Sequence, residues 1–335
     1  LGTFIATFIY ALLALRTIRG GDDNAFVPPL TITLGVVLVI VSAGVLIFFI
    51  HHIASSIQAD TILEQVGKEL HHVIDRLYPE PLGHGPPPRV ERPEAGLPPG
   101  FDDDTFPIHA LRDDYLQTVD DERLMEIARE HDLVLRLRHR PGDFVVRGAV
   151  LADVWPARAR DTKLIKALYR TFALGRYRSI EHDAEFGIDQ IVEVATRALS
   201  TGINDPFTVT TAIDRLSGAL RQLADRGFPE RFRYDDEGSL RVVADTTSFS
   251  GFVDSAFNQI RQNANGSAAV LIRMLEAIER IAECVRTEEQ RRSLREHARL
   301  VLEAGEEGIA AERDKRELRQ RYDAATRALR AARAA

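Results

Sequence analysis

The sequence predicts an α+β protein: a transmembrane helical hairpin (part of a larger bundle) plus a mainly helical soluble domain with a small β-barrel-like module. The segment 30–50 contains no charged residue, and at about 1.5 Å per residue it spans roughly 30 Å, the thickness of a bilayer core. From residue 158 onward, apolar residues recur at three- and four-residue steps, as in helices. Between residues 111 and 157 short apolar runs are separated by turn signals, as in strands.

The composition of the chain excludes some classes of protein. The net charge of the 335 residues is −7, and this acidic balance argues against a nucleic-acid-binding protein, because phosphate contacts need a basic surface. The single cysteine, Cys284, forms neither an intrachain disulfide nor a cysteine-based metal cluster. We therefore expect a protein whose partners are the lipid bilayer and copies of itself, and no nucleic acid.

The hairpin is predicted over residues 1–52. The uncharged segment 1–15 is too short to span a bilayer alone, so we expect it to be the end of a longer transmembrane helix that begins upstream. A polar loop, 16–24, then leads into the second helix. Arg16 and Arg19 in this loop favour a cytoplasmic loop, which would place the soluble domain outside the cytoplasm.

Hydroxyl-bearing side chains share one face of each hairpin helix. Thr3, Thr7 and Tyr10 follow helical spacing in the first helix, and Thr31 and Ser42 do so in the second. One interpretation is close helix packing, which small and hydroxylic residues permit. The other is the lining of a pore. Neither span contains Asp, Glu, Lys or Arg, so both lack the usual groups of a proton relay or a voltage sensor.

The second helix is expected to continue beyond the membrane. Apolar residues recur at helical spacing through 53–78, which predicts an amphipathic stalk helix. Its apolar stripe must pack against the protein's own domain or a neighbouring subunit. The following segment, 79–110, is a Pro/Gly-rich linker with few apolar residues to cover the stripe, so we expect a homo-oligomer.

Three further segments complete the predicted organisation. Residues 111–157 form the small β module, in which the turn 140–143 separates two strands. Residues 158–285 form a helical domain with a β-hairpin at 231–243. The segment 286–335 is a charged C-terminal helix whose thin apolar stripe is expected to face solvent or a partner: Leu318, Tyr322, Ala325 and Leu329.

The first candidate site is an acidic segment that contains a histidine. His182, Asp183 and Glu185 lie together, with Asp189 one turn further along. Such a set can bind a metal ion or act as an acid/base pair. Alternatively, the carboxylates complement the dipole of a helix, cap it and pair with nearby arginines. The identity of a metal or cofactor is left open.

The second candidate is the polar turn that contains Asn204 and Asp205, where a ligand or ion site and a pair of helix caps are both consistent with the sequence. Gly202 is expected to end the preceding helix with a positive φ, so that Gly202→Val would cost about 1 kcal/mol or more. A helix over 183–199 separates the two candidates by roughly 24 Å, so they can meet only across a subunit interface or through a chain reversal.

Six short motifs resemble those of one bacterial family. They are 1–10 (LGTFIATFIY), 50–54 (IHHIA), 140–145 (RPGDFV), 185–188 (EFGI), 197–200 (RALS) and 202–207 (GINDPF). As a set they resemble the predicted membrane proteins named domain of unknown function 2254. The resemblance implies four transmembrane helices, some of them before Leu1, and a cytoplasmic soluble domain, against the argument from the loop arginines. Thr201 replaces a proline that such proteins commonly have, and His182 replaces a glutamine, which argues against His182 as a required ligand. Because the family is named for an unknown function, the resemblance assigns no catalytic residues.

These observations predict an oligomeric protein of the bacterial inner membrane, with a channel or transport assembly regulated by a cytoplasmic domain as the leading function. A membrane-tethered sensor or scaffold without a pore is the alternative, and a metal-dependent hydrolase is third. The sequence contains no Gly-rich phosphate loop, nucleophile elbow or paired-histidine zinc helix, which argues against a familiar enzyme.

Overall fold

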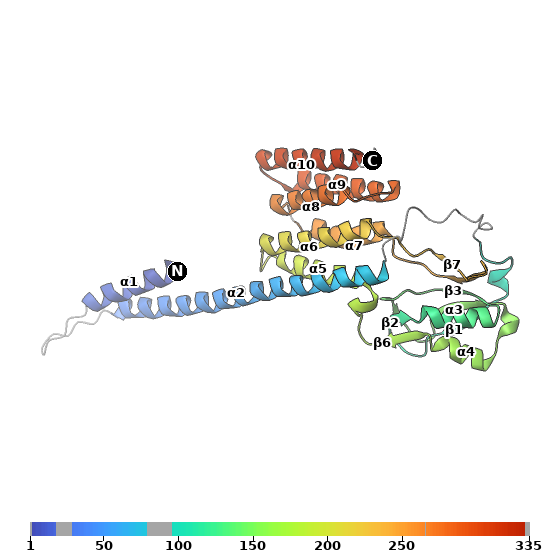
Figure 1. Ribbon diagram of the computed structural model, residues 1–335. Coiled ribbons are helices and arrows are strands. Elements are labelled where there is room, and N and C mark those ends of the chain that lie inside the picture. Colours follow the sequence, from blue (N-terminus) through green and yellow to red (C-terminus); the bar gives the residue numbers. More distant parts are fainter. Residues whose placement is uncertain (1, 18–28, 79–95, 265, 332–335) are drawn as a thin grey trace. The chain divides into compact units, whose positions relative to one another are not determined.

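The structure is a computed structural model that describes residues 2–17, 29–78, 96–264 and 266–331 (Figure 1). The chain forms two compact units, Leu1–Thr61 (unit 1) and Ile62–Ala335 (unit 2). Most of the predicted hairpin loop and residues 79–95 of the predicted linker lie outside the described residues.

Unit 1 contains α1 (Gly2–Thr17) and the first part of α2 (Pro29–Leu77). Within the described residues, Leu30–Ile50 is the one segment that is long and apolar enough to cross a bilayer, and almost all of it is exposed. The apolar part of α1 is shorter than a membrane span, so the predicted transmembrane hairpin is not confirmed.

The two helices of unit 1 contact each other through hydroxyl groups. Thr7 Oγ1 lies 2.8 Å from Ser42 Oγ, and both side chains are buried. The Tyr10 hydroxyl donates to the carbonyl oxygen of Thr31 at 3.1 Å. These pairs show that α1 and α2 run antiparallel here, because the residue numbers rise in one helix as they fall in the other.

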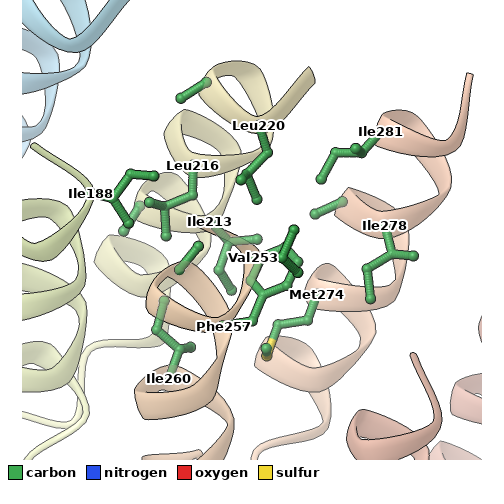
Figure 2. Packing of buried hydrophobic residues seen from close by; sticks show 14 of the residues in the cluster. Ile188, Ile213, Leu216, Leu220, Val253, Phe257, Ile260, Met274, Ile278 and Ile281 are labelled. Atoms are coloured by element: carbon green, nitrogen blue, oxygen red, sulfur yellow. The ribbon is translucent and has the colours of Figure 1, made fainter. Parts of the chain in front are cut away.

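The helical part of unit 2 has the end of α2 as one member. The other helices follow in chain order: α5 (Ala184–Ala198), α6 (Pro206–Ala224), α7 (Phe249–Asn263), α8 (Ala268–Ala282), α9 (Glu288–Gly308) and α10 (Glu312–Ala331). Their apolar faces meet in one core (Figure 2). Ile213, Val253 and Met274, from three different helices, are completely buried there.

Two apolar stripes for which an outside partner was one of the expectations are covered by this core. Leu63, Leu70 and Ile74 of α2 are completely buried in it. Leu318 and Leu329 of α10 are completely buried too, so the C-terminal stripe does not face solvent or a partner as predicted. The charged C-terminal segment is also two helices rather than one. Both stripes are amphipathic helix faces that unit 2 buries by itself, so they give no reason to expect an oligomer.

The β part of unit 2 consists of two open sheets. The first has the strand order β1-β5-β3-β8-β7, and the second has the order β4-β2-β6. The strands are β1 (Phe106–His109), β2 (Asp114–Val119), β3 (Val134–Leu137), β4 (Phe144–Val145), β5 (Val150–Trp155), β6 (Phe172–Gly175), β7 (Phe232–Tyr234) and β8 (Leu240–Val243). The described residues therefore form no closed barrel, and the barrel-like module is not confirmed.

The predicted β-hairpin at 231–243 belongs to the first sheet. Strand β8 pairs in parallel with β3, Leu135 opposite Val242, so the sheet joins strands from the predicted β module and from the predicted helical domain. Helices α3 (Asp121–Glu130) and α4 (Thr162–Tyr169) belong to this part, and Asp120 and Asp161 cap them. A second core lies between these helices and the strands.

Candidate functional site

A cleft of about 210 Å³ lies where the helical and β parts of unit 2 meet. Its walls come from the end of α2, the turn between β3 and β4, the start of α5 and the segment between β8 and α7. The side chains that line the cleft include Tyr78, Val119, Asp121, Leu137, Arg140, His182, Asp183, Glu185, Arg233, Asp245, Thr247 and Phe252. The acidic segment predicted from the sequence thus lies in the cleft.

Asp183 holds the start of α5 at the edge of the cleft. Its Oδ1 accepts from the Phe186 backbone N–H at 3.2 Å, the geometry of a helix N-cap. Its Oδ2 pairs with Arg178 at 2.7 Å, and Arg178 also pairs with Asp189 at 2.7 Å. Capping and arginine pairing, one of the two interpretations weighed from the sequence, account for both carboxylates.

The turn that contains Gly142 packs directly against this carboxylate. Gly142 has φ +98°, and a Cβ atom there would lie 2.2 Å from Asp183 Oδ2. Only a residue without a side chain leaves room for such an approach and adopts this backbone conformation without strain. The motif 140–145 and the acidic segment, far apart in the sequence, are therefore neighbours.

Glu185 joins three elements through its two carboxylate oxygens. Its Oε2 lies 3.0 Å from Arg140 Nη2 and accepts from the Thr247 hydroxyl at 3.1 Å. Its Oε1 accepts from the Ser255 hydroxyl of α7 at 2.8 Å. Arg140 also donates to Thr247. This network connects the β3–β4 turn with α5 and α7.

Burial changes the acid–base behaviour of this region. It raises the pKa of Asp183 and of Asp189, an effect that the pairing with Arg178 opposes without cancelling. Burial, with the charges of Asp183 and Glu185, raises the pKa of Tyr78 to about 12. The Tyr78 hydroxyl therefore stays protonated at neutral pH and can donate a hydrogen bond.

The acidic groups of the cleft are already paired with arginines. Besides Asp183 and Glu185, Asp121 pairs with Arg233 at 3.0 Å and Asp245 pairs with Arg231 at 3.0 Å. By contrast, neither the Tyr78 hydroxyl nor the His182 ring has a hydrogen-bond partner among the residues that the structure describes. The groups left available to a ligand are thus a hydroxyl and an imidazole ring, each of which can donate a hydrogen bond.

Asn204 and Asp205 lie outside the cleft, in the turn after α5. Asp205 caps α6, accepting from the N–H groups of Phe207 and Thr208 at 3.1 and 3.3 Å. The 15 residues of α5 separate this turn from Asp183 by about 22 Å along the helix axis. Within one chain, the two candidate sites are at opposite ends of α5.

The prediction for Gly202 is wrong, because the turn places its positive φ elsewhere. Asn204 has φ +47°, whereas Gly202 is not among the residues with positive φ. Asparagine tolerates this conformation through local hydrogen bonding, and the Asn204 N–H donates to the Ser200 carbonyl oxygen at 2.9 Å.

Sequence reasoning missed the cleft residues that come from other segments. Arg140 was interpreted as part of a turn, and Tyr78 and Thr247 were not singled out. The unusual turn sequence 140–143 was the available signal, but it does not show which segment the turn contacts. In the described part of the chain, no group of three or more His, Cys, Asp or Glu side chains is arranged to hold a metal ion.

Comparisons with known proteins agree with the motif-based resemblance. The model of the family described as "Predicted membrane protein (DUF2254)" matches residues 1–280. The chain is 31% identical over 320 residues to the uncharacterized protein Rv1290c of Mycobacterium tuberculosis and to the uncharacterized protein Mb1321c of Mycobacterium bovis. These matches cover 94% of this chain but only 60% of each relative's length. No solved structure shows a significant match.

Proposed function

The chain belongs to the DUF2254 family of predicted membrane proteins, and we propose that it is a membrane-tethered sensor of a small anionic ligand. It lies in the bacterial inner membrane, with unit 2 in the cytoplasm, the orientation that the family resemblance implies. The exposed, uncharged surface of Leu30–Ile50 supports the membrane location, because water is a poor environment for so large an apolar surface.

One observation carries the proposal: the same helix contains the apolar segment and ends at the cleft. Helix α2 runs without interruption from Pro29 to Leu77, and both Leu77 and Tyr78 line the cleft. A ligand that contacts Tyr78 therefore touches the end of the element that enters the membrane. A ligand that binds Tyr78 and orders the end of α2 changes the conformational equilibrium of this helix. In this way a tethered sensor can transmit ligand binding to its membrane segment.

The chemistry of the cleft favours an anion with an apolar part. The Tyr78 hydroxyl and the His182 ring offer donors to a carboxylate or phosphate, while the acidic side chains are neutralised by arginines. Val119, Leu137 and Phe252 add apolar surface to the same walls. Pockets of this composition bind small molecules by combining apolar contact with a few directed polar groups.

A homo-oligomeric channel or transport assembly is the other function that the sequence suggests, and the structure offers it less support. Two members of the hydroxyl face, Thr7 and Ser42, hydrogen-bond to each other. This favours the packing interpretation of that face over pore lining. The apolar stripe of α2 that suggested subunit contacts is covered by unit 2 itself.

Calorimetric titration of the full chain in lipid nanodiscs tests the ligand class. We expect the anions phenyl phosphate and benzoate to bind at least about tenfold more tightly than neutral benzamide or cationic benzylamine, a difference of roughly 1.4 kcal/mol. His182→Ala should weaken anion binding, and His131→Ala, at an exposed position outside the cleft, is the matched control. Equal affinities for all four probes, or equal effects of the two substitutions, would refute the proposal.

Amide hydrogen exchange of the same samples tests the sensor mechanism. Saturating phenyl phosphate should slow exchange in residues 62–77 of α2, because Tyr78 is held by the ligand. Exchange in α10, which does not line the cleft, serves as the internal reference. Binding without any change in α2 would leave a ligand site but contradict the sensor.

A further inference from the structure

A second cavity of unit 2 is lined mainly by arginines. Its volume is about 210 Å³, several times the roughly 30 Å³ that a water molecule occupies in the liquid. We call it the arginine pocket, and the residues that line it are Arg136, Leu137, Arg138, Arg231, Val243 and Asp245. Leu137 and Asp245 also line the cleft, so the two cavities are neighbours.

Strand geometry brings two of these arginines to the same face of the first sheet. Arg136 belongs to β3, and Arg138 continues the pairing with β5, because its N–H donates to the Leu151 carbonyl oxygen at 2.9 Å. Side chains alternate along a strand, so both arginines lie on the face opposite to Leu137, which the core buries. Asp153 of β5 is directly opposite Arg136 and shares this face.

One buried carboxylate holds both arginines. Asp153 Oδ2 accepts from Arg136 Nε at 3.2 Å and from Arg138 Nε at 2.5 Å, and its side chain is only 13% exposed. The Arg136 guanidinium also lies 4.9 Å from the centre of the Phe101 ring. Asp153 therefore orients two guanidinium groups but neutralises only one of their two charges.

The other carboxylates near the pocket are exposed. Asp102 pairs with Arg136 at 2.7 Å and is 74% exposed, and Asp245 pairs with Arg231 at 3.0 Å and is 76% exposed. Ion pairs at such positions contribute little to stability, because water and salt screen them. The Nη groups of Arg138 and Arg231 have no hydrogen-bond or ion-pair partner in the described part of the chain. The pocket thus keeps N–H donors available to an anion.

We propose that the arginine pocket binds a phosphoryl group. A guanidinium presents its N–H groups as a planar fork that matches two oxygens of a phosphate, and Arg138 and Arg231 provide two such forks. A phosphate monoester carries about −1.5 to −2 charges at pH 7, more than the single charge of the Asp245 carboxylate that it displaces from Arg231. This inference goes beyond the proposed function and does not depend on the ligand of the cleft.

Calorimetric titration of the full chain with inorganic phosphate tests the pocket. In phosphatidylcholine nanodiscs we expect saturable binding, which Arg138→Gln and Arg231→Gln should each weaken about tenfold or more, because each removes charge-assisted hydrogen bonds. Arg123→Gln is the matched control and should bind as the wild type does. Arg123 is 49% exposed and pairs with Glu126 outside the pocket, much as Arg138 is 47% exposed and pairs with a carboxylate.

Asp245→Asn gives a result that loss of folding cannot imitate. Without the competing carboxylate, phosphate should bind about threefold more tightly or better, which corresponds to the usual strength of an exposed ion pair. Equal phosphate affinities in the wild type, Arg138→Gln and Arg231→Gln, with no gain in Asp245→Asn, would refute the arginine pocket.

Further arms separate the possible locations and sources of the phosphate. Loss of phosphate binding in His182→Ala and not in the arginine variants would place the anion in the cleft, which refutes the pocket and leaves the proposed function standing. Phosphate binding that needs both arginines, with no binding of benzoate, would support the pocket and refute the proposed function. Weaker phosphate binding in nanodiscs with phosphatidic acid than with phosphatidylglycerol would identify a lipid headgroup as the source of the phosphoryl group, and equal binding would identify a soluble molecule; either result supports a phosphoryl site.

Discussion

The contact between Gly142 and Asp183 makes a quantitative prediction for Gly142→Ala. A Cβ atom would meet Asp183 Oδ2 at 2.2 Å and Asp183 Cγ at 3.0 Å, so the carboxylate or the turn has to move. The Asp183 side chain is only 7% exposed, and its movement weakens both the cap of α5 and the pair with Arg178. A lost cap costs about 1 kcal/mol, and a broken buried pair costs roughly 3–5 kcal/mol.

Gly148→Ala is the matched control. Gly148 also has positive φ, +87°, but its missing Cβ would meet nothing within 4 Å. Both substitutions therefore carry the strain of a non-glycine residue at positive φ, about 1–2 kcal/mol, and only Gly142→Ala adds the displaced carboxylate. We expect Gly142→Ala to be at least about 2 kcal/mol more destabilising than the control, even if the pair is only partly weakened.

Thermal unfolding followed by circular dichroism measures this difference. About 2 kcal/mol corresponds to roughly 4–8 °C in Tm for a unit of this size. Amide exchange at Phe186, whose N–H donates to Asp183, should accelerate in Gly142→Ala and not in Gly148→Ala. Equal Tm values for the two variants, with unchanged exchange at Phe186, would show that the carboxylate does not pack against this turn.

Three further predictions concern other parts of unit 2. Gly202→Val should leave Tm nearly unchanged, because Gly202 lacks a positive φ and has open space around it. Asn204→Val should destabilise the protein by about 1 kcal/mol, because Asn204 has a positive φ. A larger loss of Tm for Gly202→Val than for Asn204→Val would contradict the turn geometry. Leu70→Ala should lower the free energy of unfolding by about 2–5 kcal/mol in denaturant titrations, and Ile62→Ala, at an exposed position, by less than about 1 kcal/mol. Similar values for the two variants would mean that unit 2 does not bury the stripe of α2. Since burial raises the pKa of Asp183 in the folded state, its carboxylic acid form favours folding, and that contribution is lost as pH rises through the folded-state pKa. The stability of the wild type relative to Asp183→Asn should therefore be greater at about pH 4 than at about pH 7, and a pH-independent difference would argue against the raised pKa.

Local structure in this chain was predictable because it depends on neighbours in the sequence. The spacing of apolar residues predicts α6 and α8, and the turn residues around position 142 predict the break between β3 and β4. Capping by Asn204 or Asp205 was one of the two interpretations open from the sequence, because capping needs only an acceptor next to free N–H groups, and Asp205 is the residue that caps α6. The uncharged segment 30–50 was likewise evident from composition and length.

Which faces and segments meet was decided only by the tertiary structure. The amphipathic pattern of α2 shows that its stripe must be covered, but the same pattern suits a neighbouring subunit and the protein's own core. The thinner stripe of α10 suited solvent or a partner equally, and only packing buries it in that core. The pairing of β3 with β8 and the network of Glu185 with Arg140 and Thr247 join residues far apart in the chain. Such contacts depend on the free energy of the whole packed unit, which competes with the entropy of closing long loops. Short-range spacing therefore predicted most of the helices, several of the strands and the candidate membrane span, whereas the cleft exists only because packing brings its walls together.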